Sequence, residues 1–421
     1  MHSGVIDEGL DTAFLNGGVL RLPHAPEPSP AGVERAVPGL VDALLENREE
    51  LLSVLTRVAT RQAAGDEFFR SLRALSGAPW ELMRNSPGRL GRLAAFLPSN
   101  NLLYSYVLFG VIPSLYTDEV RLRPSARVAP AAMAVHEILG PRVRALGGRF
   151  EMAPVSQKEF LADCARSDAV VFTGQPDNAV TVAAQMPHDA LFLSFGSGPN
   201  PLVVGPEADL DAACRSVLAA RLYNSGQDCL CTDVVFVHRS VARDLVGRLA
   251  DALSAVRVGD RRDPDTLVAP LVYPDAVEGA AEFLAGHQEF VVRGGGVDVD
   301  RAVVQPSLLH LPWQESFHPP EFFSPVVLTM EYDHPRQIEQ WLHSPEEDVR
   351  GMYLQVFGEP SLQGPRIGTS VVSAERITFD VEDGNRPFGG HGLQAGSVRV
   401  GGTVAARPLL LSAEAARRAR S

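Results

Sequence analysis

The sequence predicts an α/β protein built from two domains in series. From about residue 94, short apolar runs that end in Gly, Pro or Asn alternate with helical stretches. This alternation is typical of a parallel sheet with helices on its faces. The 421 residues suffice for two ordinary domains. A Gly- and Pro-rich passage, SGPNP at 197–201, is the candidate hinge between them.

The first part of the chain is expected to be mainly helical, after a Pro-rich start. ALLENREELLSVLTRVATRQ (43–62) places its leucines roughly on one helical stripe. The preceding SPAGVERAVPGLVDAL is expected to add another helix, with Ser29 as its N-cap. The most apolar long run, 102–116, is shorter than a bilayer span of about 20 residues, so it predicts a buried helix.

Five apolar runs then predict buried strands that lead into loops. They are AAFLPSNN, EVRLRPS, RFEMAP, DAVVFTG and ALFLSFG, with PAAMAVHEIL as an intervening helix. In the second domain, ADLDAACRSVLAARLYNSG (208–226) predicts a helix that ends at the motif NSGQDCLC. A strand, DVVFVH, and a helix capped by Ser240 should follow. RPLLLSA (407–413) is expected to form a last strand.

Composition and charge exclude several classes of function. With 45% hydrophobic and 21% charged residues, the chain has the composition of a soluble globular protein. The net charge of -13 argues against nucleic-acid and anionic membrane partners. Lys158 is the only lysine, which leaves almost no scope for Schiff-base chemistry. MHSGVIDEGL lacks the pattern of a signal peptide, so we expect a cytoplasmic protein.

The motif NSGQDCLC contains two of the four cysteines, Cys229 and Cys231. The simplest interpretation of Cys229 is an inert core thiol. CxC is a poor zinc motif without a second ligand pair, and redox sites usually use CxxC. A nucleophile would need a cysteine presented on a turn with hydrogen-bond donors nearby, which Gly226 would permit.

Five separated stretches, taken in order, resemble the aldehyde dehydrogenase superfamily. They are FLPSNN, RLRPS, VVFTG, NSGQDC with ADLD upstream, and PEFFSPV with NRPFGG, and they extend from about residue 94 to about 400. The resemblance implies a Rossmann-like dinucleotide-binding domain with its helical lead-in (1–197) and a second α/β catalytic domain (198–395). The C-terminal segment (396–421) could supply an oligomerisation strand, and a homodimer is expected.

The resemblance also implies the reacting groups. Cys229 becomes the nucleophile, and the side-chain amide of Asn100 becomes a donor to the oxyanion, alongside the backbone N–H of Cys229. Cys231 falls on a position without a catalytic role. Phe388, in PFGG, would line or support the site entrance.

The cofactor implied by the resemblance is NAD or NADP. Arg123 stands where the family usually has a lysine that contacts a ribose. Ala126, with Arg127 adjacent, replaces a glutamate of NAD-preferring members and would tolerate the 2′-phosphate of NADP. In the FTG turn the usual serine and glycine are replaced by residues 175–179, which leaves the phosphate contacts open. The complete implied cofactor set is Arg123, Ser125, Phe172, Thr173, Gly174, Glu321 and Phe323.

One departure from the family decides the expected subclass. Hydrolytic members have a glutamate in a motif resembling LELGG, whereas this chain reads LSFGSG, with Ser194 at that position. Without a carboxylate base, water should be a poor acyl acceptor, and a thiol such as coenzyme A needs less help. We therefore expect an acylating enzyme that converts an aldehyde to an acyl thioester, or the reverse.

Two alternatives stay open. A hydrolytic enzyme could use another carboxylate before PFGG: Glu375, Asp380 or Glu382. A non-catalytic relative could act as a binding or scaffolding subunit. The sequence does not identify the aldehyde.

Overall fold

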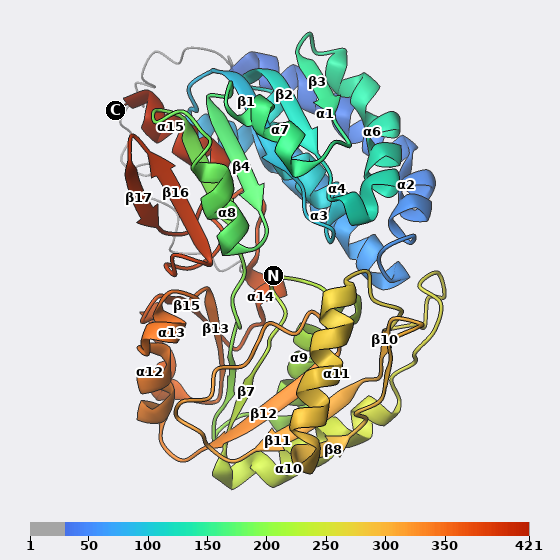
Figure 1. Ribbon diagram of the computed structural model, residues 1–421, viewed down its shortest axis with the longest axis vertical. Coiled ribbons are helices and arrows are strands. Elements are labelled where there is room, and N and C mark those ends of the chain that lie inside the picture. Colours follow the sequence, from blue (N-terminus) through green and yellow to red (C-terminus); the bar gives the residue numbers. More distant parts are fainter. Residues whose placement is uncertain (1–29, 421) are drawn as a thin grey trace, which may run out of the picture.

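The structure, a computed structural model, describes residues 30–420. The proposed cap at Ser29 lies outside this range. Two sheets form the bodies of an upper and a lower domain (Figure 1). Within residues 30–420, no helix combines the length and the apolarity that a membrane crossing requires.

The first sheet has seven strands in the order β17-β16-β5-β4-β1-β2-β3. Five of these strands run parallel, as the alternating pattern predicts: β5, β4, β1, β2 and β3. β16 joins antiparallel to β5 and carries β17 at the edge. The bounds are β1 Leu90–Phe96, β2 Thr117–Arg123, β3 Arg149–Met152, β4 Ala169–Thr173, β5 Leu191–Phe195, β16 Gly396–Val400 and β17 Thr403–Ala406.

The second sheet has eight strands in the order β14-β15-β13-β6-β7-β12-β11-β8. The passage 196–201 joins β5 of the first sheet to β6 of the second, where the hinge was expected. The bounds are β6 Leu202–Val204, β7 Val235–His238, β8 Val291–Arg293, β11 Ser307–Leu311, β12 Val326–Tyr332, β13 Tyr353–Phe357, β14 Arg366–Ile367 and β15 Ser370–Ala374, with a separate ribbon of β9 Val297–Asp298 and β10 Val303–Val304.

Helices cover both sheets. Strands buried on both faces read as continuous apolar runs, which explains why β4 is predicted so readily. The helices around the first sheet are α1 Pro30–Glu46, α2 Arg48–Leu55, α3 Arg61–Asn85, α4 Leu102–Tyr106, α5 Ile112–Ser114, α6 Ala129–Arg144, α7 Gln157–Cys164, α8 Pro176–Ala183 and α15 Leu411–Arg420. Those of the second part are α9 Leu210–Leu222, α10 Arg239–Ser254, α11 Pro274–Gly286, α12 Pro335–Leu342, α13 Pro345–Asp348 and α14 Thr378–Val381.

The expected buried helix over 102–116 is confirmed, and its middle is unusual. Between α4 and α5 the backbone forms a π-helix, η2 Val107–Val111. Such segments are rare and often occur at functional sites. Here η2 turns Leu108 and Phe109 toward the large cavity described below.

Three local predictions were wrong. The single helix over 43–62 is divided, because Thr60 has an extended backbone and its hydroxyl accepts the Ala63 N–H at 3.4 Å to begin α3. α10 is capped by the His238 ring, which accepts the Ser240 N–H at 3.3 Å. RPLLLSA is not a strand: Leu409 makes an isolated bridge to Phe388, and α15 then begins at Leu411. Within the described range no strand precedes β1.

Candidate active site

A cavity of about 580 Å³ lies where loops of both sheets meet. Its first-domain wall comes from loops at the carboxyl ends of β1, β2, β4 and β5, the usual place for ligands in parallel sheets. All ten residues that the sequence suggested line this one cavity: Asn100, Arg123, Ser125, Phe172, Thr173, Gly174, Cys229, Glu321, Phe323 and Phe388. The chain thus brings together residues up to 288 positions apart, although their chemical roles stay predictions.

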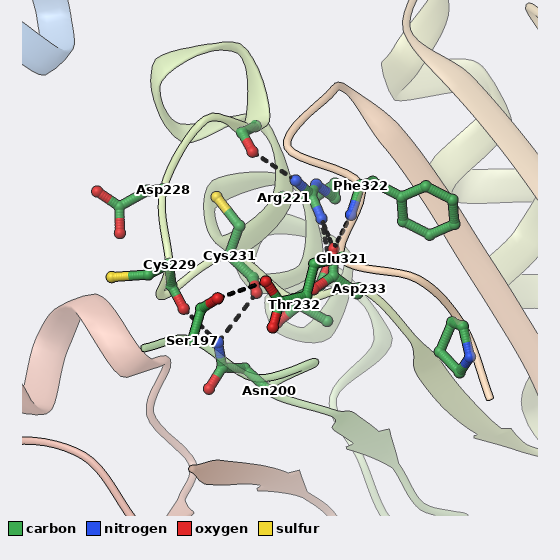
Figure 2. A network of polar contacts seen from close by, with 12 residues as sticks. Ser197, Asn200, Arg221, Asp228, Cys229, Cys231, Thr232, Asp233, Glu321 and Phe322 are labelled. Atoms are coloured by element: carbon green, nitrogen blue, oxygen red, sulfur yellow. Dashed lines mark hydrogen bonds and ion pairs between the residues drawn. The ribbon is translucent and has the colours of Figure 1, made fainter. Parts of the chain in front are cut away.

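Side chains hold the loop that carries Cys229 by hydrogen bonds to its backbone (Figure 2). Gly226 has a φ of +81°, and a Cβ there would lie 2.3 Å from the Ser324 carbonyl oxygen, so glycine is required. The Asn200 amide donates to the Cys229 carbonyl at 2.7 Å. Arg221, buried beneath the loop, donates to the Gly226 carbonyl at 2.6 Å. The cysteine is therefore presented on a turn with fixed ends, as a nucleophile requires.

The Cys229 thiol is half-buried in an acidic environment. Burial raises its pKa well above the ordinary value, and the nearby charges of Asp228, Glu321 and Glu382 raise it further. The thiol is therefore protonated at neutral pH, and the thiolate expected from the sequence needs a proton acceptor. Cys231 is fully buried with its side chain turned elsewhere (Figure 2), which matches a position without a catalytic role.

Asn100 lies beside Cys229 in the cavity with its amide oriented by two neighbours. Its Oδ1 accepts a hydrogen bond from the Tyr273 hydroxyl at 3.1 Å. Its amide is thereby left to donate, and it interacts with Asp228. The next residue, Asn101, adopts a left-handed φ of 55° and donates to Asp228 Oδ2 at 2.8 Å. The Asn100 amide is thus available as a donor in the cavity.

The turn after β4 lines the part of the cavity where the sequence predicts the cofactor phosphates. The Thr173 hydroxyl donates to the Phe96 carbonyl at 2.8 Å, and the Gly174 N–H donates to Phe195 at 3.1 Å with a φ of +145°. α8 begins directly afterwards, and Gln175 at its N-cap makes no side-chain cap bond. Free N–H groups at a helix N-terminus favour anions, so the turn fits a pyrophosphate despite its altered residues.

The nucleoside side is formed by the RLRPS loop. Arg123 donates from Nε to the Val155 carbonyl at 3.0 Å and stacks over the Phe96 ring at 5.7 Å. Ser125 accepts from the Ser99 hydroxyl at 2.8 Å. Arg127 also lines the cavity, where it pairs with Asp275 at 2.6 Å.

The PEFFSPV loop contributes a carboxylate and an aromatic ring. Glu321 accepts a hydrogen bond from the Ser197 hydroxyl, and burial raises the pKa of Glu321 (Figure 2). Phe323 has a strained φ of 45° and meets the Tyr273 ring edge-on at 5.4 Å. Phe388 packs against Phe195 at 6.3 Å, close to Cys229. These positions suit a nicotinamide riboside placed opposite the thiol.

The position of the missing family glutamate cannot supply a base. Ser194 is buried in β5, pairs with Ser397 in register, and does not line the cavity. Of the three carboxylates suggested as substitutes, Glu375 accepts the Gly358 N–H at 2.8 Å and Asp380 caps α14. Only Glu382 reaches the cavity.

Sequence reasoning missed a polar cluster that surrounds Glu382. Arg70, from α3, pairs with Glu382 at 2.9 Å, and the Tyr104 hydroxyl donates to the same carboxylate. Asp228 precedes the cysteine in the motif NSGQDCLC, but the sequence suggests no role for it. Arg70 and Tyr104 carried no local signal, because only the fold brings α3 and α4 to the cysteine loop.

Comparisons with known proteins agree with this geometry. The family model "Aldehyde dehydrogenase family" matches residues 152–346. A succinate-semialdehyde dehydrogenase [NADP(+)] 1 of Mycobacterium bovis is 31% identical over 219 residues, covering 50% of this chain and 47% of that protein. A second such enzyme, from Mycobacterium avium, is 26% identical over 339 residues, covering 79% and 66%. The chain thus spans about half the length of the first of these relatives.

Solved structures share the fold. The aldehyde dehydrogenase KauB of Pseudomonas aeruginosa superposes with a TM-score of 0.77 at 20% identity, covering 92% of this chain and 82% of that one. The glyceraldehyde-3-phosphate dehydrogenase GapN of Methanocaldococcus jannaschii, complexed with NADP, gives 0.76 at 16% identity, covering 93% and 88%. The matched family model and the semialdehyde dehydrogenase relatives support membership of the aldehyde dehydrogenase superfamily, and the solved structures share its two-domain fold.

Proposed function

We propose that the protein is an NAD(P)-dependent aldehyde dehydrogenase that works through a covalent Cys229 adduct. The observation that supports this most directly is the one cavity that Cys229, Asn100, Glu321 and the FTG turn line together. The relatives named above are dehydrogenases of aldehydes, which agrees with the proposal.

In this mechanism the Cys229 sulfur adds to the aldehyde carbon. The Asn100 amide and the Cys229 backbone N–H then stabilise the alkoxide. The bound nicotinamide supplies the hydride acceptor. Glu321 and Phe323 hold its riboside, and an acyl-cysteine remains on the protein.

A thiol such as coenzyme A is our proposed acyl acceptor, and the reverse reaction would reduce an acyl thioester to an aldehyde. Support comes from Ser194, which offers no carboxylate and lies outside the cavity wall. General-base assistance to water is worth about 10²–10⁴-fold, so its absence favours a more acidic nucleophile.

Hydrolysis is the second candidate, and one observation favours it. Glu382 lines the cavity and burial raises its pKa, which suits a general base. Arg70 and the Tyr104 hydroxyl occupy this carboxylate, however, so it must leave at least one partner to activate water.

NADP is the proposed cofactor preference, because Arg127 lines the cavity next to Ala126 and is 42% exposed. A 2′-phosphate could compete with Asp275 for this guanidinium. A cytoplasmic homodimer remains our proposal for location and assembly, and sedimentation of the intact chain tests the latter.

The experiment combines intact-protein mass spectrometry with cofactor absorbance. Wild type and Cys229→Ala are incubated with a panel of aldehydes and NADP+ or NAD+, with and without coenzyme A. An adduct confined to wild type, and reduced cofactor whose turnover requires coenzyme A, would support the acylating proposal. Equal turnover to free acid without coenzyme A favours hydrolysis. No adduct and no reduced cofactor with any aldehyde would favour a scaffolding subunit.

A further inference from the structure

We propose that Asp228, the residue before the nucleophile, accepts the Cys229 thiol proton as the sulfur attacks the aldehyde. This inference rests on the proposed function and names a base for the thiol, a step separate from the activation of water for which Ser194 offers no carboxylate.

Asp228 has the position that such a base needs. It lines the same cavity, is 5% exposed, and leaves the loop on the same side as the Cys229 thiol (Figure 2). Its Oδ1 accepts the Leu230 N–H at 2.9 Å and its Oδ2 accepts the Asn101 amide at 2.8 Å. No Arg, Lys or His nitrogen of residues 30–420 forms an ion pair with Asp228. Protonation of its carboxylate would therefore break no ion pair.

The other carboxylates around the thiol have an ion-pair partner or lie on the cofactor side. Glu382 is paired with Arg70 and hydrogen-bonded to Tyr104. Glu321 is hydrogen-bonded to Ser197 on the cofactor side. Among the nearby charges, Asp228 raises the pKa of the Cys229 thiol the most.

Other titratable groups face the pair from several elements, and they set the pH at which it works. Burial raises the pKa of Asp228, while Arg70 and the neighbouring amides lower it. The surrounding groups are Glu67 and Arg70 from α3, Tyr223 and Cys231 from the cysteine loop, Tyr273, Glu321 and Glu382.

The step balances in atoms and charge. The S–H bond breaks and its proton moves to a carboxylate oxygen of Asp228, while the C–S bond forms and the carbonyl electron pair moves onto oxygen. The Asn100 amide can then donate to the new alkoxide. Asp228 returns the proton to water before the next turnover.

The Leu230 contact alone would also suit a purely structural role, since an acid that accepts the N–H two residues on stabilises a turn. In Asp228→Asn the side-chain amide cannot take a proton. This variant keeps the hydrogen bond from Leu230 but not the one from the Asn101 amide, because two amide donors would meet there. Asn101→Ala is therefore measured beside it and should keep the pH dependence of wild type.

The test measures hydride transfer in a single turnover, with excess enzyme, across pH. We expect Asp228→Asn to slow this step about 10²–10⁴-fold at pH 7. Wild type should lose rate as falling pH protonates the carboxylate, and the variant should lack this acid limb. Asp251→Asn, the same change at an exposed site on α10, should match wild type in both respects. A variant rate within about tenfold of wild type with an unchanged profile would overturn the proposal.

Chemical rescue covers the case of a folding defect. Formate added to Asp228→Ala should restore part of the rate, and a folded variant that formate fails to rescue would count against a proton-transfer role. Failure of the proposed function is distinguishable, because wild type itself would then form no Cys229 adduct.

Discussion

Replacing Glu67 by Gln should stabilise the protein at alkaline pH. Glu67, from α3, is 3% exposed and lies beneath the loop that carries Asn100. One carboxylate oxygen accepts the N–H groups of Leu103 and Tyr104 at 2.6 and 3.1 Å, so Glu67 caps α4 from a distance. Burial, with smaller effects of Asp228 and Asp66, raises its pKa from 4.5 to about 7.

The sign and size of the effect follow from this pKa. A carboxyl group with a raised pKa contributes stability that is complete below about pH 4.5 and is lost as the pH rises through 7. Above pH 7 the folded state carries an unfavourable buried charge. Glutamine keeps the volume and the acceptor oxygen without the charge. The expected gain in unfolding free energy at pH 8 is about 3 kcal/mol.

Urea unfolding at pH 5 and pH 8 measures this gain. The gain in unfolding free energy of Glu67→Gln should be largest at pH 8. At pH 5 it should shrink to about 1 kcal/mol, because Glu67 is already protonated in the folded state and only the unfolded wild type still ionises. Glu50→Gln, on an exposed face of α2, is the matched control and should show no such pH dependence. Equal stability of wild type and Glu67→Gln at pH 8, or a less stable variant, would refute the reasoning.

Three further changes have defined outcomes. Arg127→Ala should lower kcat/KM for NADP about 10–100-fold, because a charge-assisted hydrogen bond to the 2′-phosphate is lost, and should change kcat/KM for NAD little. Steady-state kinetics with both cofactors measure the two values. Arg221→Met should cost about 3–5 kcal/mol in chemical unfolding, since Asp233 is left unpaired in the core, and adding Asp233→Asn should recover part of it. Cys231→Ala should cost about 1 kcal/mol and leave the single-turnover rate unchanged; a large rate loss would contradict its assignment as a packing residue.

The parallel strands could be predicted because burial on both faces leaves little choice of residue. β4 and β5 are apolar along their length and end at a turn, so both composition and boundary were visible. The end of the chain was less clear. A short apolar run such as RPLLLSA fits a strand or the start of a helix equally well, and its packing against the first domain decides for the helix.

The candidate site shows the same division. The motif residues could be found because each lies in or beside a turn that has a recognisable sequence motif. The polar groups around them could not, since Glu67 and Arg70 precede the cysteine by more than 150 positions and read as ordinary helix residues. Capping at α10 was missed for a different reason. Serine is the commoner cap, but here the helix begins two residues earlier, and the His238 ring nitrogen accepts the N–H of Ser240.

The return of β16 and β17 to the first sheet has a consequence for how the protein is made. The second sheet uses one uninterrupted stretch, 202–374, and can close as soon as that stretch has left the ribosome. The first sheet must wait, with the β5 edge unpaired, until residues 396–406 of β16 and β17 emerge. Nascent chains stalled before residue 396 should therefore expose that edge to chaperones and to one another.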